Sequence, residues 1–297
     1  MKYNASVNIE IGVGSDYNYI VTPNVQRVLG DIISSINSGI HSFSVIGTYG
    51  TGKSSFLIAL ERGLTSNYDI LVKDRTVFFG CKKFEVLNIV GEYAPLQRLL
   101  ERKLNSEGMN TLEAFKSFFI SKEAVGKAVI LAIDEFGKIL EHAAKNNPEE
   151  ELYFIQQLCE LVNDHRRNVL LLTTLHQNFG SYSSGLSDSQ RKEWQKVKGR
   201  FKEVVFSEPV EQLLFMASEQ LKIDDSQKTP TNNLQTIFNL ARHCKFITDG
   251  FTFQTAKRLN PLDPLAATCL TQAIQKYGQN ERSLVSIRRN TYFSWFK

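Results

Sequence analysis

Residues 47–54 read Gly47-Thr-Tyr-Gly-Thr-Gly-Lys53-Ser54, a complete G-x-x-x-x-G-K-S pattern. The apolar stretch 42–46 before it predicts a strand, and residues 55–62 after it have the spacing of a helix. A glycine-rich loop between a strand and a helix start gathers backbone N–H groups at the positive end of the helix dipole, where they can bind phosphate. An ordinary glycine-rich turn is the alternative, but chance produces the pattern in only on the order of one chain in a hundred of this length.

The loop pattern predicts a role for each of its residues. Lys53 is expected to reach the β- and γ-phosphates of a nucleotide, and the Ser54 hydroxyl is expected to bind Mg²⁺. The sequence has no N-K-x-D motif for reading a guanine base, so ATP and Mg²⁺ are the predicted cofactors. The predicted nucleotide-binding residues of the loop are Gly47, Thr48, Tyr49, Gly50, Thr51, Gly52, Lys53, Ser54 and Ser55.

The composition is that of an ordinary globular protein. The 297 residues carry a formal charge of +4, with 42% hydrophobic and 22% charged residues, so bulk charge demands neither a nucleic acid nor a membrane partner. The first residues lack the apolar core of a signal peptide, and no apolar run approaches the roughly 20 residues that cross a bilayer. We therefore expect a cytoplasmic protein without a membrane partner. The four cysteines form no C-x-x-C pair, and we expect buried thiols.

Apolar segments alternate with helical patterns along the first two thirds of the chain. The alternation predicts an α/β fold in which helices cover both faces of a five-stranded parallel sheet. A period of two over 5–13 predicts a further strand, and 64–83 reads as an inserted hairpin or loop. The expected sheet strands are 42–46, 84–90, 127–133, 168–175 and 204–206, and the expected helices are 24–37, 95–105, 111–120, 150–162 and a basic helix that begins near 191.

The pattern changes near Ser207-Glu-Pro209. Beyond it no long apolar strand occurs, and helical stretches are expected near 209–222, 232–247 and 264–277. We therefore predict a phosphate-binding domain over 1–208 and a small helical domain over 209–297.

The expected strand at 127–133 ends in Asp134-Glu135. In a phosphate-loop enzyme the first carboxylate at such a strand end holds Mg²⁺, and the next one polarises the attacking water. Asp134 is therefore predicted as a metal ligand together with Ser54, and Glu135 as the catalytic base. A solvated strand end is the alternative when the pair is considered without the loop.

Polar side chains also follow the strand at 168–175. An amide or an imidazole there can orient the attacking water, so His176 and Asn178 compete for this catalytic role, while an ordinary turn remains the alternative. Arg200 comes just before the last expected strand, where an arginine can be presented to the γ-phosphate of a neighbouring subunit. Arg282, in a loop that leads into the last helix, is predicted to reach over bound nucleotide, with a surface capping contact as its alternative.

With these motifs in place, the chain resembles the AAA+ ATPases, and in layout the initiator and origin-recognition branch and bacterial defence-type relatives. The resemblance rests on Walker A at 49–55, Walker B at 133–138, a polar strand end similar to sensor 1, an arginine-finger segment at 199–201 and a sensor 2 segment at 280–284. It covers about 20–290 and implies an αβα P-loop NTPase domain followed by a helical lid. It also implies ATP hydrolysis in a homo-oligomer, with roles in phage defence or mobile-element biology.

The sequence departs from the family pattern in two ways. The stretch between Lys53 and Asp134 is longer than usual, which implies an insertion. The chain also ends soon after Arg282, which leaves no room for the DNA-binding winged helix of initiators or for a fused effector. Two interpretations stay open: a truncated polypeptide, or an ATPase subunit that works with a separate protein effector.

Two other functions stay open. A small-molecule kinase would normally carry an arginine-rich lid and would not need the tandem carboxylates. A nucleotide-dependent switch that binds ATP tightly and recognises DNA or a protein would keep Lys53 and Asp134 but depend little on Glu135. Pairs such as Arg166-Arg167, Lys196 with Lys198, and Arg288-Arg289 could contact DNA phosphates, or they could be solvated surface.

Overall fold

The computed structural model describes residues 7–12, 19–66, 68–220, 230–248 and 250–277. Within them the chain forms two compact units, one of residues 7–47 and 52–206, and one of residues 48–51 and 207–277. The units therefore divide between Phe206 and Ser207, where the sequence analysis placed a domain boundary after residue 208. Each unit is described by itself.

The first unit is built on a parallel sheet, as predicted. Its strands lie in the order β2-β3-β4-β1-β5, and every neighbouring pair is parallel. Because the strands are parallel, their carboxyl ends meet at one edge of the sheet and their amino ends at the other. The strand bounds are β1 Ser42–Ile46, β2 Lys83–Val90, β3 Lys127–Asp134, β4 Val169–Leu175 and β5 Lys202–Val205.

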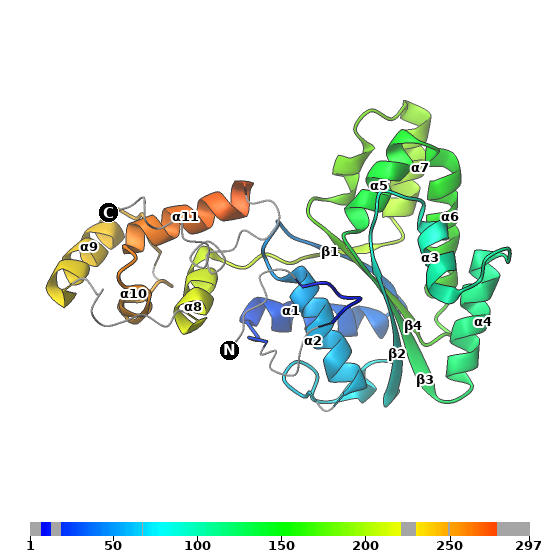
Figure 1. The fold of residues 1–297 in the computed structure, drawn as a ribbon, viewed down its shortest axis with the longest axis horizontal. Helices are drawn as coiled ribbons and strands as arrows, with labels where there is room; N and C mark the ends of the chain where they lie inside the picture. Colours follow the sequence, from blue (N-terminus) through cyan, green and yellow to red (C-terminus); the bar gives the residue numbers. More distant parts are fainter. Residues whose placement is uncertain (1–6, 13–18, 67, 221–229, 249, 278–297) are drawn as a thin grey trace. The chain divides into compact units, whose positions relative to one another are not determined.

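Helices cover both faces of this sheet, which confirms the expected α/β class (Figure 1). Successive side chains of a strand point to opposite faces of the sheet. In β3, Val129 and Leu131 pack with the helices of one layer, and Ala128 and Ile130 pack with those of the other. One layer contains α1 (Pro23–Ile36) and α2 (Lys53–Thr65), and the other contains α3 (Leu96–Leu104), α4 (Thr111–Glu123), α5 (Phe136–Lys145), α6 (Pro148–Val162) and α7 (Asp188–Lys198).

The structure corrects or completes four of the expectations drawn from the sequence. The described residues of the predicted strand 5–13 form a turn, in which Ile9 is buried and Ile11 is exposed. The region 64–83 was predicted as an inserted hairpin or loop; its described residues between α2 and β2 form a loop with a short 3₁₀ turn, η1 (Arg75–Val77), and no hairpin. Helix α5 was not predicted. The expected buried thiols were only partly correct, because Cys159 is buried whereas Cys244 and Cys269 are exposed.

The second unit is helical in its described part, as predicted. Its core is formed by apolar side chains such as Leu214, Phe238, Phe251 and Leu259. The helices are α8 (Val210–Gln220), α9 (Thr231–His243), α10 (Phe253–Leu259) and α11 (Pro264–Tyr277). Helix α10 was missed, since a helix of 7 residues gives little periodic signal.

Candidate functional site

Three neighbouring strands bring the predicted site residues to the carboxyl edge of the sheet. Strands β3, β4 and β1 are adjacent, and Asp134, His176 and Gly47 stand at their respective ends. The pairing continues past β1, because the Gly47 backbone N–H donates to the Leu175 carbonyl at 3.0 Å. The order of the strands, which the sequence does not reveal, is what places these segments side by side.

The glycine loop has the backbone that its pattern requires. Gly50 and Gly52 have φ angles of 74° and 92°, in the left-handed region that favours glycine. Helix α2 begins at Lys53, and its first turn carries no acidic side chain. An anion at this helix start would therefore meet the positive end of the helix dipole without a competing carboxylate from that turn.

Lys53 is held at the base of the loop. Its Nζ donates to the Gly47 carbonyl at 2.6 Å. Burial lowers the pKa of Lys53 from 10.5 to about 8, while Asp134 and Glu135 act in the opposite direction. The ammonium, at the start of α2, favours an anion, and the two carboxylates beside it favour a cation such as Mg²⁺ next to that anion.

Asp134 is buried at the end of β3, with 4% of its surface exposed. Its Oδ1 accepts from the Thr174 hydroxyl at 2.5 Å and from the Glu135 backbone N–H at 3.1 Å. These donors stabilise the carboxylate and fix its direction. Thr174 belongs to β4, so the contact joins the two strand ends.

Glu135 is exposed and has a strained backbone. Its φ is 52°, a left-handed value that is uncommon for residues other than glycine, and its carboxylate forms an ion pair with Lys138. Gly91 permits this turn, because a Cβ atom there would lie 2.9 Å from the Glu135 carbonyl carbon and closer still to its oxygen. The Gly91 N–H also donates to the Asp134 carbonyl at 2.7 Å.

His176 contacts a buried tyrosine. The Tyr182 hydroxyl lies 2.9 Å from Nδ1 of His176. Burial lowers the pKa of His176, Lys53 lowers it further, and Glu141 and Glu135 oppose this change. The imidazole is therefore neutral at pH 7 and within the electrostatic reach of Lys53 and Glu135. Gly137 leaves room for the tyrosine, since a Cβ there would lie 2.8 Å from its Cζ.

Asn178, the other candidate for orienting water, has a local structural role. It is the N-cap of the 3₁₀ turn η2 (Phe179–Ser183), and its Oδ1 accepts from the Ser181 N–H at 3.0 Å. The side chain is exposed. The choice between His176 and Asn178 stays a prediction, and the capping bond gives Asn178 a structural reason to be there.

Arg200 lies at the amino ends of the parallel strands, whereas its own loop lies at their carboxyl ends. It precedes β5, whose first residue Lys202 pairs with Phe43 near the start of β1. The Arg200 Nη2 lies 2.5 Å from Oε1 of Glu160 on α6. Since the loop follows the far end of β1, Arg200 is separated from it by the length of that strand, about 16 Å for five residues.

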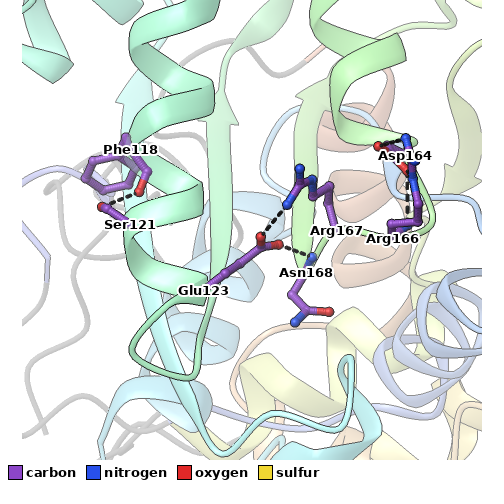
Figure 2. Close-up of polar contacts among 7 residues, drawn as sticks. All are labelled: Phe118, Ser121, Glu123, Asp164, Arg166, Arg167 and Asn168. Atoms are coloured by element: carbon purple, nitrogen blue, oxygen red, sulfur yellow. Dashed lines mark hydrogen bonds and ion pairs between the residues drawn. The ribbon is translucent and has the colours of Figure 1, made fainter.

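The basic pairs considered for DNA contact are bound to carboxylates where the structure describes them. Arg166 pairs with Asp164 at 2.9 Å and Arg167 with Glu123 at 3.2 Å. Figure 2 shows both pairs as dashed lines. The Glu123 carboxylate also accepts from the Asn168 N–H at 2.6 Å, which ties α4 to the start of β4. Lys196 and Lys198 likewise form ion pairs, with Glu193 and Glu203. Arg288 and Arg289 lie outside the described residues.

Arg282 and its segment also lie outside the described residues. Within the described part, no group of three or more His, Cys, Asp or Glu residues could hold a metal ion. This is compatible with Mg²⁺, which commonly takes only one or two protein ligands together with phosphates and water. In the same part of the chain no helix is long and apolar enough to cross a membrane.

Sequence reasoning missed three residues that build the site. Thr174 was expected only as part of the buried strand 168–175, because its bond to Asp134 depends on the order of the strands. Gly91 follows a predicted strand directly, where a glycine permits close backbone approach. Tyr182 carries no such signal, because only the fold brings it to His176.

Comparison with solved structures finds similar folds at low identity. The ORC2 protein of Aeropyrum pernix, in ADPNP–ADP complexes, is 15% identical with a TM-score of 0.49, and the match covers 92% of this chain and 70% of that one. PCH-2 of C. elegans is 16% identical with a TM-score of 0.42, covering 88% and 65%. A Walker-type ATPase of Pyrococcus abyssi is 12% identical with a TM-score of 0.39, covering 91% and 71%. No family model and no curated protein matches the chain. The similarity is one of fold.

Proposed function

We propose that this protein binds ATP with Mg²⁺ at the carboxyl edge of its sheet and hydrolyses the terminal phosphoanhydride bond. One arrangement carries this function: Lys53, Asp134 and Glu135 meet at that edge, and both carboxylates act on the partly desolvated ammonium. A cation with paired carboxylates beside a glycine loop matches the needs of phosphoryl transfer, in which catalysis is mainly positioning and charge stabilisation.

The residues present fit the nucleotide and the metal. The left-handed glycines Gly50 and Gly52 allow the backbone of loop 47–54 to turn around an anion, and the start of α2 supplies N–H groups. Lys53 would bind the β- and γ-phosphates. Ser54 and Asp134 would hold Mg²⁺, which, when bound, neutralises charge on the phosphates. Thr174 keeps the Asp134 carboxylate oriented for this role.

Glu135 is the residue that we assign to the attacking water. It is exposed, next to the metal-binding Asp134, and its left-handed backbone is a strained conformation of the kind that clusters at active sites. His176 is the stronger candidate to orient the water, because Asn178 already caps η2. A neutral imidazole can accept or donate a hydrogen bond without adding charge.

Arg200 is assigned to a neighbouring copy of the chain. Its place at the amino edge separates it from its own loop, so it would act only across a subunit boundary. We therefore propose a homo-oligomer in which each pocket is completed by the next subunit's arginine, which stabilises transition-state charge. The nucleotide cycle would drive assembly or remodelling of a separate partner protein, in phage defence or mobile-element biology.

One observation favours a second candidate, a slow ATP-dependent switch. The Glu135 carboxylate is engaged in an ion pair with Lys138, whereas a catalytic base has to hydrogen-bond the attacking water. In a switch, Glu135→Gln would change the rate of turnover little. DNA stays a sequence-based prediction for either function, because the described arginine pairs are already bound to carboxylates.

A mixing experiment tests the proposed function. Arg200→Ala protein should bind ATP normally but hydrolyse it slowly, and Lys53→Ala protein should bind none. Mixing the two should restore part of the activity, because the Lys53→Ala subunit donates its intact arginine to the competent pocket of the other. Turnover that is independent of protein concentration and shows no rescue on mixing would refute the trans assignment. Retained ATP affinity in Lys53→Ala would refute the site itself.

A further inference from the structure

The segment that carries Arg200 is held by the last turn of α6. Arg200 lies between the end of α7 and the start of β5. Two side chains from α6 and its C-cap reach it, Glu160 at the guanidinium and Asn163 at the backbone. They are three residues apart, so they project from the same face of the helix end.

Asn163 makes two hydrogen bonds that fix its amide in one orientation. Its Oδ1 accepts from the His41 N–H at 2.8 Å, and its Nδ2 donates to the Arg200 carbonyl at 3.3 Å. A backbone N–H can only donate and a carbonyl can only accept, so the partners decide which end of the amide is oxygen. Asn163 thus joins the backbone before β1 to the backbone before β5.

This connection fixes the arginine relative to the strand that leads into the phosphate loop. His41 immediately precedes β1, and β1 and β5 are paired along their length. The pairing begins at Lys202, so Asn163 extends the fixed region by two residues, up to Arg200 itself. The Arg200 side chain is one third exposed, and its Nε is buried without a hydrogen-bond partner among the described residues.

We propose that Asn163 is a positioning residue for Arg200: it fixes the backbone from which the guanidinium is presented to the pocket of a neighbouring copy of this chain. This rests on the proposed trans role of Arg200. Asn163 itself lies at the amino edge with Arg200, so it takes no part in binding nucleotide in its own subunit. Its loss should therefore impair a subunit as a donor of arginine and leave it intact as a receiver.

This asymmetry is the test. Asn163→Asp keeps the acceptor for the His41 N–H and loses the donor to the Arg200 carbonyl. In one mixture Asn163→Asp is added to the Lys53→Ala donor, and the receiver carries Arg200→Ala alone. In the other mixture Asn163→Asp is added to the Arg200→Ala receiver, and the donor carries Lys53→Ala alone. The altered donor should lose on the order of 10-fold of the rescued ATPase rate, because small misplacements of a catalytic group cost that much or more. The altered receiver should be rescued as well as the unmodified one.

Asn146→Asp in the same donor is the matched control. Asn146 is also a helix C-cap whose Nδ2 donates to a carbonyl, that of His142 at 2.9 Å, but it does not contact Arg200. The donor that carries Asn146→Asp should restore the same ATPase rate as the donor without it. Asn163→Ser is the second variant if Asn163→Asp does not fold, which a thermal melt of each donor shows. Equal losses as donor and as receiver, or no loss in either, would overturn the positioning role. Absence of rescue by the unmodified Lys53→Ala donor would instead refute the trans role of Arg200, and this proposal with it.

Discussion

The lowered pKa of Lys53 predicts that nucleotide affinity falls as the pH rises above about 8. The unliganded protein loses the Lys53 proton near that pH, whereas a bound phosphate stabilises the ammonium and keeps it charged. Binding above this pH must therefore take up a proton. Below it the ammonium is already charged, and affinity should be nearly flat.

The size of the effect follows from the two protonation states. With a pKa of about 8 in the free protein, the affinity for ADP with Mg²⁺ should fall about 25-fold between about pH 7.5 and about pH 9.5, or about 1.9 kcal/mol. A terminal phosphate, with a last pKa of about 6, is fully ionised over this range and adds little. ADP is used because it cannot be turned over during the measurement.

Isothermal titration calorimetry in two buffers of different ionisation enthalpy measures both quantities, the affinity and the number of protons taken up. We expect close to one proton at the upper end of the range and about a quarter of a proton at the lower end. Lys53→Arg is the matched control, because a guanidinium stays charged throughout and its binding should not depend on pH. An affinity that is independent of pH in the unsubstituted protein, with no proton uptake, would refute the reasoning.

The same shift has a consequence for the unliganded fold. The pKa of Lys53 in the folded state lies below the unfolded value of 10.5, so the unfolded chain binds more protons between about pH 8 and 10.5. The contribution of Lys53 to folding therefore becomes more favourable as the pH rises through this window. Lys53→Met, which removes the buried cation, should flatten this dependence in chemical denaturation and raise the free energy of unfolding at pH 7.

Three further substitutions test the geometry of the strand ends. Gly91→Ala should destabilise the protein by about 1–3 kcal/mol in chemical denaturation, because the new Cβ would overlap the Glu135 carbonyl; an unchanged midpoint would mean that the turn can shift. Glu135→Gly should relieve the left-handed backbone, by about 1 kcal/mol, and raise the melting temperature by about 2–4 °C while abolishing turnover; a lower melting temperature would show that the backbone is not strained. Thr174→Val should cost about 1–3 kcal/mol of stability and weaken the Mg²⁺ dependence of nucleotide binding, and an unaltered Mg²⁺ titration would exclude Thr174 from orienting Asp134.

The sheet could be predicted from sequence because its strands are nearly continuous apolar runs. Buried parallel strands such as 127–134 and 169–175 need no alternation, and their lengths exclude long helices. The predicted strand at 5–13 was wrong, because alternating apolar residues form a strand only where a neighbouring strand can pair with them. Val7, Ile9 and Ile11 have a period of two, but the chain turns there and leaves Ile11 exposed.

The site was predictable as far as local motifs reach. The loop around Lys53 and the carboxylates after β3 have patterns of their own, and the structure brings them to one edge of the sheet. Contacts between strands leave no local pattern, so the bond from Thr174 to Asp134 was missed. The sequence also offered no ground for choosing between His176 and Asn178. The choice depends on the capping bond that Asn178 accepts and on the contact of His176 with Tyr182, and both form only when η2 folds.

The measurement that tests the central claim most directly compares the fate of ATP in the unsubstituted protein and in the Glu135→Gln protein. Each protein is incubated with labelled ATP and Mg²⁺, separated from free nucleotide, and denatured, and the released nucleotide is identified. The unsubstituted protein should release mainly ADP, and the Glu135→Gln protein mainly ATP in similar amount, because the amide keeps the shape of the side chain but cannot polarise water. ADP in equal proportion from both proteins, or no nucleotide from either, would contradict the proposed ATPase site.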